Sequence, residues 1–308
     1  LDLFGFITLS GNFAFKTATG DFTVADGSTS TQLTSAEYLA IGASDTTGSV
    51  GVGGVGLALN SVELAMVVVS DEANSVEYTA VKASVGSASF TGVSGLTMSV
   101  NSLSLLVNQT DDDANPNKVL DFADTASHSG DDAAAALSVA TGPSSSTDID
   151  HDGDEGSLLQ LAGNVDLDLF GFITLSGNFA FKTATGDFTV ADGSTSTQLT
   201  SAEYLAIGGN VSTASVGIGG VGFALNDIEL AMVVVSDEDN SVEYTAVKAS
   251  IGSASFTGVS GLTMTVNSLS LLVNQTDDTA NSNKVLDFAD TASHGADDGA
   301  AALSVADR

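Results

Sequence analysis

The chain has 308 residues, 43% of them hydrophobic, and it carries 39 Asp and Glu against 7 Lys and Arg, a formal net charge of −32. This apolar content suffices for a core and excludes disorder throughout, while the charge repels nucleic acid and anionic membrane surfaces. Cysteine is absent, which excludes disulfides and thiol chemistry, and the longest apolar runs, at residues 50–59 and 64–69, are too short to span a bilayer.

The chain opens with a period of two, which predicts β-strands from the first residue onward. The apolar positions of this opening are Leu1, Leu3, Ile7, Leu9, Phe13 and Phe15, and Gly11-Asn12 is expected to break the strand. Because Leu1 stands inside this alternation, we expect the chain to be an excerpt of something longer.

Two segments indicate short helices. Residues 34–41 begin with Thr34 and Glu37 at the spacing of a capping box, and residues 131–139 are an alanine run behind two aspartates. Elsewhere the alternation continues, in residues 76–90 and 96–107, and acidic turn-forming stretches separate the predicted strands. The fold class predicted is therefore all-β with short helical segments.

Gly51, Gly53 and Gly56 match the spacing of a dinucleotide-binding glycine motif. That motif requires a helix directly after the glycines, whereas the residues that follow here are strand-forming. We interpret these glycines as tight β-packing and expect no nucleotide cofactor.

Near-identical repetition organises the chain. Residues 1–142 align with residues 167–308 at an offset of 166 without a gap, and 19 of the 142 pairs differ. We predict a first β-module at 1–142, an acidic junction or linker at 143–166, and a second β-module at 167–308. A weaker period of 41 residues relates residues 51–64 to 92–105. Reuse of one strand–turn–strand pattern favours an elongated, β-solenoid-like stack of repeats, with tandem β-sandwich modules as the alternative.

The junction holds the candidate metal site. Asp148, Asp150 and Asp152 alternate and are followed by Gly153, as in the first half of a calcium loop. Asp154, Glu155 or backbone carbonyls would complete the oxygen ligands of Ca²⁺. Leu159 stands where an EF-hand needs a bidentate glutamate, so the segment is not an EF-hand. The alternative is a solvated acidic linker.

No motif predicts catalysis. The sequence has no HExxH, no phosphate-binding lysine loop, no Cys/His zinc cluster and no nucleophile elbow. A polysaccharide lyase would need a local cluster of carboxylates and basic residues, and the three lysines of each copy lie far apart. We therefore expect that the protein is not an enzyme.

The stretch GNVDLDLFGFITLSGNFAFK, the later YTAVKAS and the run ALSVATGP resemble repeat modules of very large secreted, adhesin-like surface proteins of bacteria. The resemblance implies an extracellular or cell-surface location, a structural or adhesive role, and calcium dependence. It carries over no functional residue beyond the type of the junction aspartates.

Together these observations predict an extracellular structural repeat protein: a stalk, filament or surface-layer element, calcium-stiffened, whose partners are copies of itself in a head-to-tail or lateral polymer. The alternative is an adhesin module that binds glycans or surfaces. Such a module should carry exposed aromatic residues, but aromatics make up 6% of the chain and Trp is absent. Salt adaptation would explain the acidity without calcium.

Overall fold

The computed structural model describes residues 2–3, 7–123, 134–238 and 240–288. The chain forms two compact units, Leu1–Gly163 and Asn164–Arg308. The boundary between them falls inside one strand, β10 (Leu158–Leu169).

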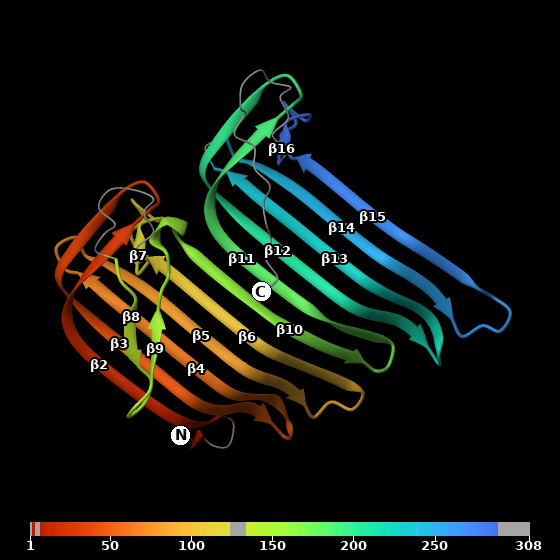
Figure 1. Ribbon diagram of the computed structural model, residues 1–308, viewed down its shortest axis with the longest axis horizontal. Coiled ribbons are helices and arrows are strands. Elements are labelled where there is room, and N and C mark those ends of the chain that lie inside the picture. Colours follow the sequence, from red (N-terminus) through yellow and green to blue (C-terminus); the bar gives the residue numbers. More distant parts are fainter. Residues whose placement is uncertain (1, 4–6, 124–133, 239, 289–308) are drawn as a thin grey trace. The chain divides into compact units, whose positions relative to one another are not determined.

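In unit 1, long antiparallel strands follow one another in chain order, each paired with the next (Figure 1). Val67, for example, lies opposite Ala40 of the preceding strand and Ala80 of the following strand. The strands are β1 (Asp2–Leu3), β2 (Ile7–Ala25), β3 (Ser30–Val52), β4 (Val55–Asp71), β5 (Val76–Thr91) and β6 (Leu96–Thr110).

Unit 2 repeats this arrangement, as the near-identity of the two copies requires. Its strands are β11 (Ile173–Ala191), β12 (Ser196–Ile218), β13 (Val221–Asp237), β14 (Val242–Thr257) and β15 (Met264–Thr276), with β16 (Val285–Asp287) paired to β11.

One half of the sheet in unit 1 is covered by a second layer. This cover consists of β7 (Val119–Asp121), which pairs with β2, and the hairpin of β8 (Leu137–Ala140) and β9 (Ser146–Ile149), which crosses β3 and β4 (Figure 1). A 3-10 helix, η1 (Gly153–Glu155), follows β9. The core lies between sheet and cover, where apolar side chains of both are fully buried, among them Val67, Val69, Leu120 and Ile149.

The structure confirms the all-β fold class with consecutively stacked strands, and each unit is one long sheet with a partial cover. The helix predicted at residues 34–41 is wrong, because these residues lie in β3 and pair with β2 and β4 on both sides. Ser35 has a positive φ of 56° and its N–H donates to Asp21. The two ladders outweigh the local capping pattern.

The helix predicted at residues 131–139 is also wrong where the structure describes it, since residues 137–139 lie in β8. Residues 131–133 lie outside the described residues. The break expected at Gly11-Asn12 is a register shift within a continuous β2, opposite Thr46. A Cβ at Gly11 would overlap Thr46, so a residue without a side chain lets the two strands approach there.

The residues after the glycine motif form a strand, as the sequence predicts, and the motif itself spans a turn between β3 and β4. Gly53 and Gly54 join β3 to β4 with φ values of 62° and 86°. A positive φ at both central residues matches the tight hairpin turn whose twist fits the flanking strands. The part of the chain that the structure describes contains no helix long and apolar enough to cross a membrane.

Candidate functional site: the acidic segment and its seat on unit 1

The acidic segment of residues 146–156 folds onto the sheet of unit 1. It begins with β9, whose Asp148 and Ile149 pair with Ser138 and Leu137 of β8. The hairpin is closed where the N–H of Thr141 donates to the carbonyl of Ser145 at 2.9 Å. Most of the predicted junction is thus folded structure that belongs to unit 1.

Side chains in this segment alternate between core and solvent. Ile149 is 0% exposed and His151 is 5% exposed, and Gly153 is buried as well. Asp148 and Asp150 are exposed. An extended chain directs successive side chains to opposite faces, so the apolar and imidazole groups face the sheet and these carboxylates face solvent.

His151 is held by backbone groups of unit 1, at its ring and at its own carbonyl. Its Nε2 lies 2.9 Å from the carbonyl oxygen of Val81 in β5, and its own carbonyl accepts from the N–H of Phe122 at 2.8 Å. Burial lowers the pKa of His151, an effect that the carbonyl of Val81 and the charge of Asp150 partly oppose. Burial thus disfavours the charged form of the ring, whose Nε2 donates to the carbonyl oxygen of Val81.

Gly153 fixes the end of the segment. Its N–H donates to Oδ1 of Asp121 at 3.0 Å, and a Cβ at this position would lie 2.6 Å from the Cβ of Asp121. Only glycine fits this close approach. Oδ1 of Asp152 accepts from the N–H of Asp154 at 2.9 Å and so caps η1.

Asp150 pairs with a lysine of the sheet. The Nζ of Lys82 lies 2.7 Å from Oδ1 of Asp150, with the two side chains 34% and 58% exposed. A solvent-exposed pair of this kind contributes about 0–1 kcal/mol, so it positions the segment more than it stabilises it.

The five predicted calcium ligands take up different positions. Asp150 is in an ion pair, Asp152 caps η1, and Asp148 lies in β9, before the turn that contains Asp154 and Glu155. Among the described residues, no group of three or more His, Cys, Asp or Glu is placed to hold a metal ion. The five side chains are not brought together as ligands of one ion, and calcium binding remains a prediction from the sequence.

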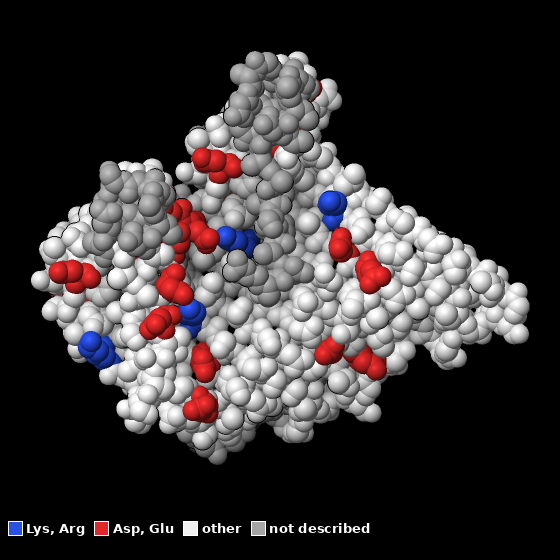
Figure 2. All heavy atoms as spheres, viewed as in Figure 1, with Lys and Arg blue, Asp and Glu red and all other residues white. Residues whose placement is uncertain are grey.

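The other acidic tracts that the structure describes cap turns. Asp112 accepts from the N–H of Ala114 at 3.0 Å and from the Asn115 side chain at 3.0 Å, and this side-chain bond lowers its pKa. Asp278 does the same in unit 2. On the face that Figure 2 shows, acidic side chains lie in small separate groups, several of them beside a lysine. The tracts at 131–132 and 297–298 lie outside the described residues.

Sequence reasoning identified the segment but missed the residues that anchor it. Ile149, His151 and Gly153 share one buried face, where Val81 receives the ring of His151 and Asp121 receives the N–H of Gly153. Lys82 pairs with the exposed Asp150. The period-two spacing of Ile149 and His151 was the available signal, since it places both on the face opposite the aspartates.

No protein-family model matches the chain, and comparisons with curated proteins and with solved structures also return no match.

Proposed function

We propose that the chain is an extracellular structural repeat protein, a stalk, filament or surface-layer element that lengthens by adding repeats along the edge of a sheet. The location outside a bacterial cell rests on the resemblance of the repeat modules to those of adhesin-like surface proteins. The structural role rests on the exposed apolar edge strand of unit 2, β15.

The observation that supports this role is a difference in side-chain exposure between two equivalent strands, β6 in unit 1 and β15 in unit 2. In unit 1 the start of β10 lies against β6, where Ser104 Oγ donates to the carbonyl of Ala162 and Gly163 lies against Leu103. The leucines of β6 are half-buried there. In unit 2 the equivalent leucines of β15 are exposed: Leu269 54%, Leu271 54% and Leu272 74%.

An exposed apolar edge strand is a template for pairing with another strand. Natural proteins usually protect such an edge with charge, and β15 carries neither Lys nor Asp nor Glu. A further repeat that supplied a strand equivalent to β10 would cover it. This supports assembly by strand addition over a binding role, which would need no such edge.

The proposal is tested by electron microscopy and sedimentation of the purified chain over a range of concentrations. We expect fibres or a concentration-dependent increase in mass. Leu269→Lys places a charge on the edge and should abolish assembly. Ile218→Lys, at a hairpin turn where the side chain is 72% exposed, is the control and should leave assembly unchanged.

Discrete particles at all concentrations would contradict the structural proposal. Equal effects of the two lysine substitutions would show that general solubility, and not the β15 edge, governs association.

A further inference from the structure

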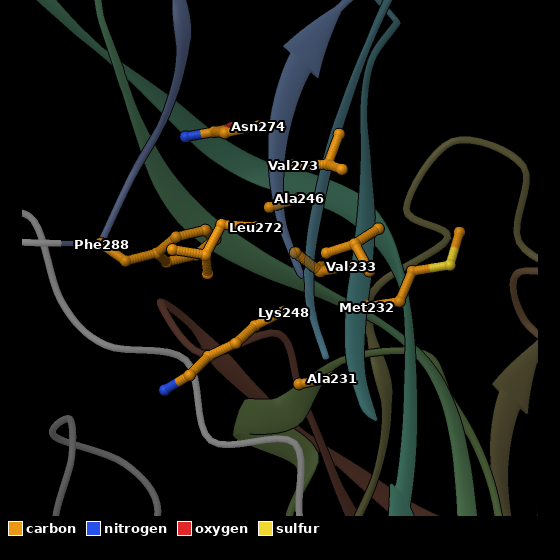
Figure 3. A pocket seen from close by; sticks show the side chains of 10 residues that line it. Ala231, Met232, Val233, Ala246, Lys248, Leu272, Val273, Asn274 and Phe288 are labelled. Atoms are coloured by element: carbon orange, nitrogen blue, oxygen red, sulfur yellow. The ribbon is translucent and has the colours of Figure 1, made fainter. Parts of the chain in front are cut away.

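Unit 2 contains a hollow with a volume of about 540 Å³, lined by β13, β14, β15 and Phe288 (Figure 3). Its walls include Ala231, Val233, Ala246, Val247 and Lys248. This volume lies within the range of roughly 300–1,000 Å³ that ligand sites occupy, and apolar side chains make up most of the lining.

The same place in unit 1 is filled by the chain itself. At an offset of 166 the lining residues are identical, so Val247, Lys248 and Phe288 correspond to Val81, Lys82 and Phe122. In unit 1 these three residues bind the acidic segment, through the ring of His151, the carboxylate of Asp150 and the carbonyl of His151 respectively.

The burial of these positions differs between the two copies, in the part of the chain that the structure describes. In unit 1 Ala65, Ala80 and Asn108 are each 0% exposed and Phe122 is 4% exposed. In unit 2 the equivalent Ala231, Ala246 and Phe288 are half-buried and Asn274 is exposed. The sequence contains residues 143–166 once, and that copy lies on unit 1 up to Gly163.

We infer that the hollow of unit 2 is a receptor for an extended segment with the sequence of residues 146–153, STDIDHDG, supplied by a further copy of the repeat. The isoleucine would fill the apolar part, the histidine ring would bond to the carbonyl of Val247, and the second aspartate would pair with Lys248. This inference deepens the proposed function, on which it rests for naming another repeat as the partner.

The probe is a fluorescently labelled peptide of residues 143–156, titrated into the full 308-residue chain and followed by anisotropy. We expect saturable binding at one site per chain. Replacing the isoleucine of the peptide by alanine should weaken binding roughly tenfold or more, because a buried aliphatic side chain is lost. A scrambled peptide is the composition control and should not bind.

Hydrogen exchange locates the site. Bound peptide should protect residues 231–248 of unit 2 and leave the equivalent residues 65–82 of unit 1 unchanged, since these are already covered. Binding without protection of β13 and β14 would overturn the inference, as would no binding at millimolar peptide.

Two receptor variants separate loss of the site from loss of the fold. Ala246→Phe fills the hollow and should abolish peptide binding. Lys248→Ala should weaken binding a few-fold, because a partly exposed ion pair is removed. Lys284→Ala, whose Nζ bonds to Oγ1 of Thr197 at 2.5 Å elsewhere in unit 2, should bind the peptide like the unaltered chain.

Peptide binding tests the receptor inference, and electron microscopy with sedimentation tests the assembly proposal, so the two can be contradicted separately. Peptide binding by a chain that never forms larger assemblies would uphold the receptor and contradict the structural function. If the chain assembles, Leu269→Lys blocks this assembly, and the peptide does not bind in the hollow, the structural function is upheld and the receptor inference is overturned.

Discussion

His151 joins the acidic segment to the sheet through a buried imidazole, and it does so beside exposed carboxylates of the same segment. Ile149, two residues earlier, packs into the apolar core, and Gly153, two residues later, lets the backbone approach Asp121 closely. Three residues on one face therefore decide where the segment lies. Asp148 and Asp150 remain exposed and keep the surface charged, while the half-buried Asp152 caps η1.

Docking of this segment should weaken as the pH falls below about 6.5, the ordinary pKa of His. Burial lowers the pKa of His151 in the folded unit, so in this range the unfolded segment binds a proton that the folded one does not. The contribution is fully present above pH 6.5 and is lost as the pH falls through the lowered pKa. Hydrogen exchange of residues 146–153 between pH 8 and pH 5 measures it.

His151→Gln should remove this pH dependence between pH 5 and 6.5, above the range in which most carboxylates titrate. An imidazole pKa at or above 6.5, measured by NMR with the variant as assignment control, would contradict the prediction.

A second residue-scale prediction compares two equivalent asparagines. The Nδ2 groups of Asn108 and Asn274 each donate to a leucine carbonyl at 2.6 Å, Leu120 and Leu286 respectively. Asn108 is 0% exposed, whereas Asn274 is exposed. Asn108→Ala leaves a buried carbonyl without its donor and should cost about 1–3 kcal/mol in the free energy of unfolding of unit 1.

The comparison is Asn274→Ala: this side chain is exposed, so water can enter where the amide was, and the cost should be smaller than at Asn108 although Leu286 is itself buried. Urea unfolding read out by hydrogen exchange in each unit separates the two. Equal costs would mean that burial of Asn108 adds nothing to its hydrogen bond.

At the scale of elements, the β8–β9 hairpin acts as the lid of the core in unit 1. It packs so closely on β3 that a Cβ at Gly42 would overlap the carbonyl oxygen of Ala140 and lie 2.9 Å from Cα of Thr141. Ser44 of the same strand donates to the carbonyl of Thr141 at 3.1 Å. The position of the hairpin is thus fixed by backbone contact as well as by apolar side chains.

Gly42→Ala should lift this hairpin and cost about 1–3 kcal/mol, because the added methyl group overpacks a contact between two backbones. Gly48→Ala in the same strand is the control: its Cβ would make an ordinary 3.4 Å contact with Leu9. That variant should be neutral or more stable by up to about 1 kcal/mol. Thermal unfolding and exchange of residues 137–149 distinguish the two outcomes, and equal behaviour would contradict the packing argument.

For the whole molecule, the charge of −32 opposes compaction in both units. Screening by NaCl should therefore raise Tm. If the aspartates of residues 148–154 bind calcium, as the sequence predicts, millimolar CaCl₂ should raise Tm beyond NaCl of equal ionic strength.

Asp150→Asn with Asp152→Asn should remove the calcium increment and leave the salt effect. Equal Tm in chelator and in calcium at matched ionic strength would contradict calcium binding and favour salt adaptation as the reason for the acidity.

The sequence predicted those parts of the fold that depend on neighbouring residues or on the internal repeat. Period-two alternation predicted the strands, because it acts through neighbouring residues. For Gly51, Gly53 and Gly56 the sequence predicted tight β-packing, and the structure places a hairpin turn there. The helix predicted at residues 34–41 failed because Thr34 and Glu37 satisfy a local rule that two flanking strands override.

The sequence alone determined the repeat, the alternation that makes strands and the acidic character of the turns. Only the tertiary structure decided the order of the strands in the sheet. It likewise decided which face of residues 148–153 is buried, since alternation defines two faces without saying which one meets a core. It also revealed the difference between two nearly identical copies. Ala80 is buried and Ala246 is half-buried, and among the described residues the acidic segment lies on unit 1 alone. Such a long-range contact leaves no trace in the residues it covers.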